Sequence, residues 1–284
     1  MKKNFAFLIA VAFLAGCSYA KEVPEVQEAP EGFVFVQGGN FANSNSNLYD
    51  TDIVVESFFI SVTEVTQSQW VEVMGSNPSQ IIGDDRPVET ITWYDAILFA
   101  NTKSLQHGLQ PFYNIDKENN DPGNLNDEDY INWLVTINPE ANGFRLPTEI
   151  EWEFAASGGT LSRSYLFSGN DDIDLVAWYF RNSGDYFLES MWHWPTIEAN
   201  NASTHPVAGK EANELGIYDM SGNVREWVWD WFSESEINPN SGSSRGIRGG
   251  GWVGSEVPAR VYERRYMPPH YSFYDLGLRL VKNN

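Results

Sequence analysis

Two carboxylates flank a tight turn in the last third of the sequence, and these residues are the best suited to bind a metal ion. Asp219 and Glu226, with the backbone near Gly222 between them, can present oxygen atoms to one hard cation. Calcium prefers oxygen ligands of this kind. The alternative is that both carboxylates only cap and brace the turn before the tryptophans that follow. We favour the first interpretation, so the sequence predicts a structural calcium site.

Other sites for chemistry find little support in the sequence. The four histidines are scattered without the spacing of metal ligands, so we expect neither zinc nor iron. Residues 145–153 combine an arginine with three glutamates, but we interpret them as scaffold. Glu151 caps a helix that begins at Thr148, and Arg145 pairs with a buried carboxylate. We interpret the arginines of residues 245–284 in the same way, as partners of acidic residues across the core.

Cys17 is the single cysteine of the chain, and it follows two lysines and an apolar run that ends at Leu14. This arrangement resembles a bacterial lipoprotein signal, in which residues 1–16 are removed and the thiol is lipidated. The alternative is an ordinary secretory signal that is cleaved after Ala20. Either signal takes the protein out of the cytoplasm.

The composition fits an exported domain on a tether. Residues 17–31 are rich in Pro and Glu and predict the tether, and residues 32–284 predict one domain. The net charge is −21, or −23 once Lys2 and Lys3 leave with the signal, which argues against nucleic acid as a partner. The 11 Trp, 13 Tyr and 17 Phe supply a core without disulfides. No later apolar run is long enough to span a bilayer, so we expect attachment through the lipid alone.

Helix and strand signals are mixed along the chain without regular alternation. Three helices are expected to begin at Thr66, Thr92 and Thr148, each with a capping signal, and Gly75 should end the first. Strand character is seen in residues 33–37, 54–62 and 217–220. Two polar stretches, residues 116–129 and 182–201, are interpreted as loops, the first as a solvated insertion. The pattern indicates an α+β domain with long irregular loops.

Eight sequence blocks in a fixed order resemble the formylglycine-generating enzyme family, also called the sulfatase-modifying factor family. They cover nearly all of residues 32–284, and the resemblance implies a loop-rich variant of the C-type lectin fold. The blocks are Phe33-Val34-Phe35-Val36-Gln37-Gly38-Gly39, Glu64-Val65-Thr66-Gln67 through Asn77-Pro78-Ser79, Arg86-Pro87-Val88-Glu89 through Ala96, Phe144-Arg145-Leu146-Pro147-Thr148-Glu149 with Glu151-Trp152-Glu153, His205-Pro206-Val207, Gly216-Ile217-Tyr218-Asp219-Met220-Ser221-Gly222-Asn223-Val224-Arg225-Glu226-Trp227, Arg248-Gly249-Gly250-Gly251-Trp252, and Leu276-Gly277-Leu278-Arg279.

The resemblance bears on both metals and catalysis. It implies calcium ligands at the side chains of Asp219 and Glu226 and at the carbonyls of Gly222 and Val224. The enzymes of the family oxidise a substrate cysteine with two active-site cysteines that bind copper, and by position these fall at Gly254 and Ala259 in this chain. Since neither residue has a thiol, we expect no copper and no formylglycine reaction.

The segment of residues 253–275 is the remaining candidate for function. Five aromatic residues lie within residues 262–274, and tyrosine is favoured at binding surfaces for its rigid contact area and polar tip. The alternative is an aromatic layer in the core, but Pro268 and Pro269 interrupt any strand pattern and favour a loop. The segment also resembles variable proteins of diversity-generating retroelements, including a treponemal surface lipoprotein. That resemblance implies ligand-facing positions at Val253, Gly254, Ser255, Val257, Pro258, Tyr262, Arg265, Tyr266, Tyr271, Phe273, Tyr274 and Asp275.

Together these observations predict a lipid-anchored receptor or adhesin of the bacterial outer membrane or cell surface. We expect a monomer that binds a protein or glycan, for example one on another cell. The alternatives are an envelope enzyme of the same family and a structural envelope lipoprotein.

Overall fold

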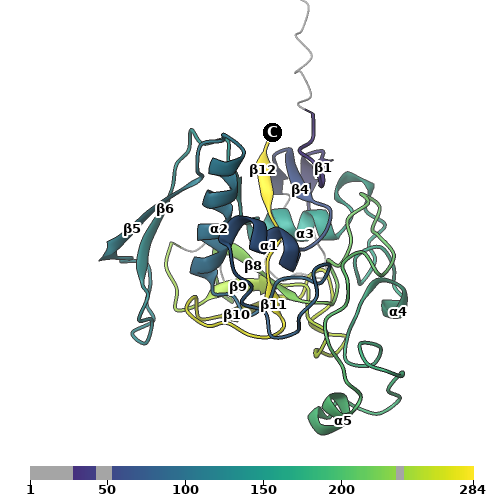
Figure 1. The fold of residues 1–284 in the computed structure, drawn as a ribbon. Helices are drawn as coiled ribbons and strands as arrows, with labels where there is room; N and C mark the ends of the chain where they lie inside the picture. The colour runs from purple at the N-terminus through teal and green to yellow at the C-terminus, as the bar shows by residue number, and fades with distance from the viewer. Residues whose placement is uncertain (1–27, 43–52, 235–239) are drawn as a thin grey trace, which may run out of the picture.

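The computed structural model describes residues 28–42, 53–234 and 240–284; Cys17, the signal and most of the expected tether lie outside them. Helices lie mainly in the middle of the chain, whereas strands are spread along its length (Figure 1). The helices are α1 (Gln67–Met74), α2 (Trp93–Gln106), α3 (Glu149–Ala156), α4 (Ile173–Val176) and α5 (Trp194–Ala199), with a 3-10 turn at Gly159–Leu161.

The three longer helices begin where the sequence predicted. In each helix the hydroxyl oxygen of the N-cap threonine accepts a hydrogen bond from the backbone amide of the residue three positions later. The side chain of that later residue accepts a hydrogen bond from the backbone amide of the threonine. The helix α1 ends at Gly75, whose φ of 82° suits a residue without a Cβ. The capping pairs are Thr66 with Gln69, Thr92 with Asp95, and Thr148 with Glu151.

Two four-stranded sheets organise the domain. The first has the order β1 (Phe33–Val36), β4 (Phe58–Ser61), β12 (Val281–Asn283) and β7 (Phe144–Arg145). The second has the order β10 (Arg265–Met267), β9 (Arg245–Arg248), β8 (Arg225–Trp231) and β11 (Leu276–Gly277). Two hairpins pair β2 (Gly39–Phe41) with β3 (Ile53–Val55) and β5 (Tyr113–Asn120) with β6 (Trp133–Ile137). The last strand of the chain is thus an inner strand, and the architecture is α+β as predicted.

Three predictions of local structure were wrong. Residues 182–201 are not all loop, because the helix α5 forms within them. Residues 217–220 form no strand, because Asp219 adopts a left-handed φ of 57° that breaks the extended run. The stretch of residues 116–129 is only partly a solvated loop. Its first residues continue β5, and Asp129 at its end is buried and accepts from the Tyr94 hydroxyl at 2.8 Å.

Most of the arginines noted in the sequence pair with carboxylates across the core, as predicted, whereas Arg265 forms a partly exposed pair with Glu263. Arg145 binds Glu151 at 2.6 Å, which confirms that this part of the chain is scaffold. Arg248 lies 3.4 Å from Glu149 with both side chains fully buried, and Arg264 reaches the other oxygen of Glu149 at 2.6 Å. These pairs join α3 to β9 and to the segment that follows it.

The first sheet and the loops before β11 lie on opposite sides of the molecule. In Figure 1, β1 and β12 lie near the top, β10 and the yellow loops around it lie below the middle, and α5 lies at the bottom. Three clusters of buried apolar side chains fill the space between, and the third of them includes Trp252 and the residues around α4 and α5. Among the described residues, no helix is both long and apolar enough to cross a membrane.

Candidate functional site

The segment of residues 253–275 is anchored to the scaffold at intervals. Gly249 and Gly250 precede it with φ values of 90° and 70°, which side chains with a Cβ rarely adopt. Trp252 is buried, and its indole Nε1 donates to the carbonyl of Tyr274 at 3.1 Å, which joins the two ends of the segment. Further buried positions within it are Ala259, Val261, Pro269 and His270. The backbone path is therefore fixed, and the positions between these anchors are half-buried or exposed.

Most positions expected to face a ligand are accessible. Tyr271 and Phe273 are exposed by 44% and 42%, in a segment that is otherwise well anchored. The exposed positions are Val257, Arg265, Tyr266, Tyr271 and Phe273, and the half-buried ones are Val253, Gly254, Ser255, Pro258, Tyr262 and Tyr274.

Asp275 differs from the other expected contact residues. It is only 3% exposed, and its carboxylate forms an ion pair with Arg225. Its carbonyl also accepts from the amide of Arg225 at 2.7 Å. The prediction that Asp275 faces a ligand was therefore wrong; the residue fastens the end of the segment to the start of β8.

A row of aromatic rings runs from the segment to α5. The rings of Phe273 and Tyr274 lie 5.0 Å apart between centroids, and Tyr274 lies 5.5 Å from Trp252 and 6.1 Å from Trp194. The guanidinium of Arg225 lies 5.5 Å from the Phe273 ring. Exposed Phe273 is thus held by a cation on one side and by packed rings on the other.

The stretch of residues 182–201 adds to this row, which the sequence did not lead us to expect. The Nε1 atom of Trp192 donates to the carbonyl of Val253 at 2.7 Å, so this loop touches the start of the segment. Trp192 is 51% exposed and its neighbour Met191 is 86% exposed. The signal in the sequence was the pair Trp192 and Trp194 within an otherwise polar loop. We call the side chains of Met191, Trp192, Trp194, Tyr271, Phe273 and Tyr274 the aromatic surface.

Two further aromatic contacts lie at the margins. Tyr271 packs edge-on against buried His270, at 4.6 Å between centroids, and His270 contacts the exposed Tyr130 at 5.2 Å. Tyr266 instead packs on Phe232, at 4.6 Å. Phe273 and Tyr274 are therefore linked by ring contacts to Trp194, whereas Tyr271 packs on His270 and Tyr266 on Phe232.

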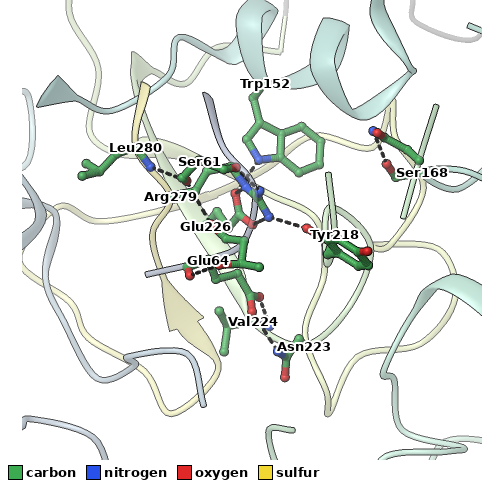
Figure 2. Close-up of polar contacts among 12 residues, drawn as sticks. Ser61, Glu64, Trp152, Ser168, Tyr218, Asn223, Val224, Glu226, Arg279 and Leu280 are labelled. Atoms are coloured by element: carbon green, nitrogen blue, oxygen red, sulfur yellow. Dashed lines mark hydrogen bonds and ion pairs between the residues drawn. The ribbon is translucent and has the colours of Figure 1, made fainter. Parts of the chain in front are cut away.

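The predicted calcium turn lies in a buried network of charges (Figure 2). Both carboxylate oxygens of Glu226 accept from Arg279, at 2.7 and 2.8 Å, and one also accepts from the indole of Trp152 at 2.6 Å. The carboxylate of Glu64 accepts from the Asn223 side chain at 2.8 Å and from the Val224 amide at 2.9 Å. Glu226 thus already has a cationic partner.

Asp219 supplies the oxygen that best fits a calcium ligand. One of its carboxylate oxygens accepts from the Ala208 amide at 2.7 Å, and the other is buried without a partner among the described residues. Burial raises the pKa of Asp219 to about 6. Burial, Asp219 and Glu226 raise the pKa of Glu64 well above its ordinary value. Three buried carboxylates thus surround the single guanidinium of Arg279, and this excess negative charge suits a hard cation.

The remaining donors of such a site would be backbone carbonyls. Among the described residues, no three His, Cys, Asp or Glu side chains are grouped to hold a metal ion. The sequence had already placed two of the four ligands at the carbonyls of Gly222 and Val224. Asp219 offers one carboxylate oxygen without a partner among the described residues, whereas both oxygens of Glu226 accept from Arg279, so bound calcium stays a prediction.

Gly254 and Ala259 lie where the family resemblance expects cysteines. The amide of Gly254 donates to the carbonyl of Gly251 at 2.8 Å, and its carbonyl accepts from the Phe180 amide at 3.1 Å. Ala259 is buried and its carbonyl accepts from the Ser221 hydroxyl at 2.7 Å. Both positions serve the packing of the segment.

Comparisons with known proteins connect the whole chain to one family. A family model described as the sulfatase-modifying factor enzyme 1-like domain matches residues 19–284. The chaperone protein LppX of Paenibacillus barcinonensis is 46% identical over 285 residues, which span all of both chains. The formylglycine-generating enzyme of Streptomyces coelicolor is 32% identical over 158 residues, 50% of this chain and 47% of that one. Treponema denticola variable protein 1 superposes with a TM-score of 0.72 at 30% identity, covering 89% and 95% of the two chains.

Proposed function

Starting from the sulfatase-modifying factor enzyme family, to which this chain belongs, we propose that the protein is a surface-displayed lipoprotein that binds a ligand. Its fold is the loop-rich, α+β, C-type lectin-like fold that the sequence predicted. The observation that carries the proposal is the aromatic surface. Exposed rings that are fixed by packing lose little entropy when a partner covers them, which is the property of a binding surface.

The orientation of the domain supports display outward from a membrane. The strand β1, which follows the expected tether, lies on the side of the molecule opposite β10 and its flanking loops (Figure 1). A lipid on Cys17 would hold the β1 end toward the membrane and leave the aromatic surface free. The ligand is then a protein or glycan that reaches the protein from outside, for example on another cell.

We propose further that residues 253–275 are diversified, as the likeness to Treponema denticola variable protein 1 supports. Anchors such as Trp252 and Val261 fix the backbone, so the exposed positions can change without loss of the fold. The test is deep sequencing of the last 120 or so bases of the gene from many cells and isolates. Substitutions at template adenines that cluster in codons 253–275 are expected. An invariant segment would remove the diversified receptor from consideration.

A second candidate is a chaperone for exported proteins, which the full-length likeness to chaperone protein LppX favours. The aromatic surface would then bind apolar segments of unfolded chains. The two candidates differ in a light-scattering assay with reduced lysozyme as the aggregating probe. A chaperone suppresses the aggregation, and replacing Trp192 and Phe273 by serine removes that effect. A receptor for one folded ligand leaves the aggregation unchanged.

Catalysis by the thiol chemistry of the family is not part of this proposal, because we match Gly254 and Ala259, which have no thiol, to the positions of its cysteines. The chain matches only about half of the length of the Streptomyces formylglycine-generating enzyme. Incubation with a sulfatase-type cysteine peptide and copper should yield no aldehyde. Aldehyde formation would instead establish an envelope enzyme.

A further inference from the structure

A second candidate site lies apart from the aromatic surface, in a cavity between β6 and β8. The cavity has a volume of about 400 Å³, within the range of small-molecule sites. Its walls combine apolar side chains, tryptophans and charged groups. The residues that matter most are Thr136 and Ile137 at its exposed strand, Trp229 and Trp231 on β8, and Asp230 and Arg245.

Asp230 gives the cavity an acceptor that is not satisfied elsewhere. The side chain is 2% exposed, and one carboxylate oxygen accepts from the Glu149 amide at 2.5 Å. The other oxygen has no hydrogen-bond partner among the described residues. A buried oxygen without a partner is costly, so a donor in the cavity would stabilise it.

Arg245 gives the cavity one matching donor. Its guanidinium carbon lies 3.9 Å from the Trp93 ring centroid and 3.6 Å from that of Trp231, so both faces are covered by rings. One terminal nitrogen donates to the Trp229 carbonyl at 2.8 Å, and the other lies 3.8 Å from Asp121. Its Nε has no partner within the part of the chain that the structure describes. The Nε–H group is therefore left for a ligand.

This set of groups selects the class of ligand by its chemistry. An anion would meet the carboxylates of Asp121 and Asp230, which repel it. A cation would meet Arg245. A hydroxyl group, in contrast, donates to Asp230 and accepts from Arg245 without adding charge, and the apolar walls suit C–H faces. We propose that this cavity binds a neutral sugar unit through hydroxyl hydrogen bonds to Asp230 and Arg245.

The test is saturation-transfer NMR on the full chain in a detergent without sugar headgroups. The probes are glucose, galactose, mannose, N-acetylglucosamine and their β-linked disaccharides, each up to about 10 mM, where a Kd of about 1 mM is saturated. We expect transfer to at least one of them. Glycine betaine and phosphate serve as the zwitterionic and anionic probes and should give no transfer.

Matched variants locate the binding. Ile137→Arg places a long charged side chain at the exposed edge of the cavity and should abolish sugar binding, whereas Leu105→Arg, at an exposed position on α2, should leave it unchanged. At pH 8, above the pKa of about 7 for Asp230, Asp230→Asn should weaken binding about tenfold, since a charged acceptor is lost. The proposal is overturned if no sugar binds, if betaine or phosphate competes with the sugar, or if Ile137→Arg binds like the wild type.

Discussion

The arginines and the aromatic residues of the last forty residues have opposite surroundings. Arg248 and Arg279 are fully buried and bound to carboxylates of α3 and β8, whereas Tyr271 and Phe273 are exposed. The two kinds of residue alternate along the same stretch of chain. In this part of the chain, buried ion pairs support the fold and exposed rings are available for binding. Substitutions of the exposed rings should therefore leave the fold intact.

The largest effect should come from breaking a buried pair. Arg279→Met leaves Glu226 buried without its guanidinium, and removing one partner of such a pair costs about 3–5 kcal/mol. Urea-induced unfolding of both proteins measures the loss. The control is Arg265→Met, whose pair with Glu263 is partly exposed and contributes at most about 1 kcal/mol. An equal loss of unfolding free energy in the two variants would contradict the conclusion that the fold depends on the buried ion pairs.

A buried carboxyl should give the next largest effect, with a pH dependence. Burial raises the pKa of Asp230 to about 7 in the folded protein, whereas the pKa in the unfolded chain is about 4. Between these two pH values only the unfolded chain loses the proton, so the free energy of unfolding falls as the pH rises and becomes constant above about pH 7. Asp230→Asn should therefore gain stability over the wild type between about pH 4 and 7, by on the order of 2–4 kcal/mol, and then level off. Urea unfolding at pH 4.5 and pH 8 measures this gain.

Glu151 provides a control because its pKa is shifted in the direction opposite to that of Asp230. Burial alone would raise the pKa of Glu151, but the ion pair with Arg145 and the bonds to Thr148 lower it overall. The charged form therefore stabilises the fold at neutral pH and this contribution is lost as the pH falls. Glu151→Gln should be less stable than the wild type at pH 8, with a smaller difference in acid. If Asp230→Asn and Glu151→Gln were both more stable than the wild type at pH 8, the direction assigned to the Glu151 pKa shift would be wrong.

Calcium should have a moderate effect on the buried network. A ligand at 100 times its Kd stabilises the folded state by about 2.7 kcal/mol, so chelation should lower the unfolding temperature by several degrees. Asp219→Asn should remove the response to calcium, while its fold is checked by circular dichroism. An unfolding temperature that is the same with calcium and with chelator would leave the turn as a purely internal charge network.

The smallest effect on stability should come from the aromatic surface. Replacing Tyr271 and Phe273 together by serine should cost no more than about 1 kcal/mol, because both side chains are exposed. Trp252→Ala, a change to a buried ring of the same row, should cost about 3–5 kcal/mol. Thermal unfolding of the three proteins compares them. A large loss for the serine variant would mean that these rings are core.

The sequence predicted the scaffold better than the surface. Helix starts were predictable because a threonine with its partner three residues on is a local signal, as at Thr148 and Glu151. The strand predicted at residues 217–220 failed because Asp219 adopts a left-handed φ, which its own residue type does not reveal. The contact of Trp192 with Val253 joins residues 61 positions apart, and the cavity at Asp230 depends on three separate strands and a helix start. Such long-range arrangements have no local pattern.

The position of β12 has a consequence for biosynthesis. This strand, residues Val281–Asn283, pairs with both β4 and β7 inside the first sheet, and it is encoded after the segment of residues 253–275. The first sheet therefore cannot close until residues 281–283 have been translated. A frameshift or stop codon within residues 253–275 would delete the strand and leave a gap between β4 and β7. Any change to the segment must therefore keep the reading frame for the domain to complete its fold.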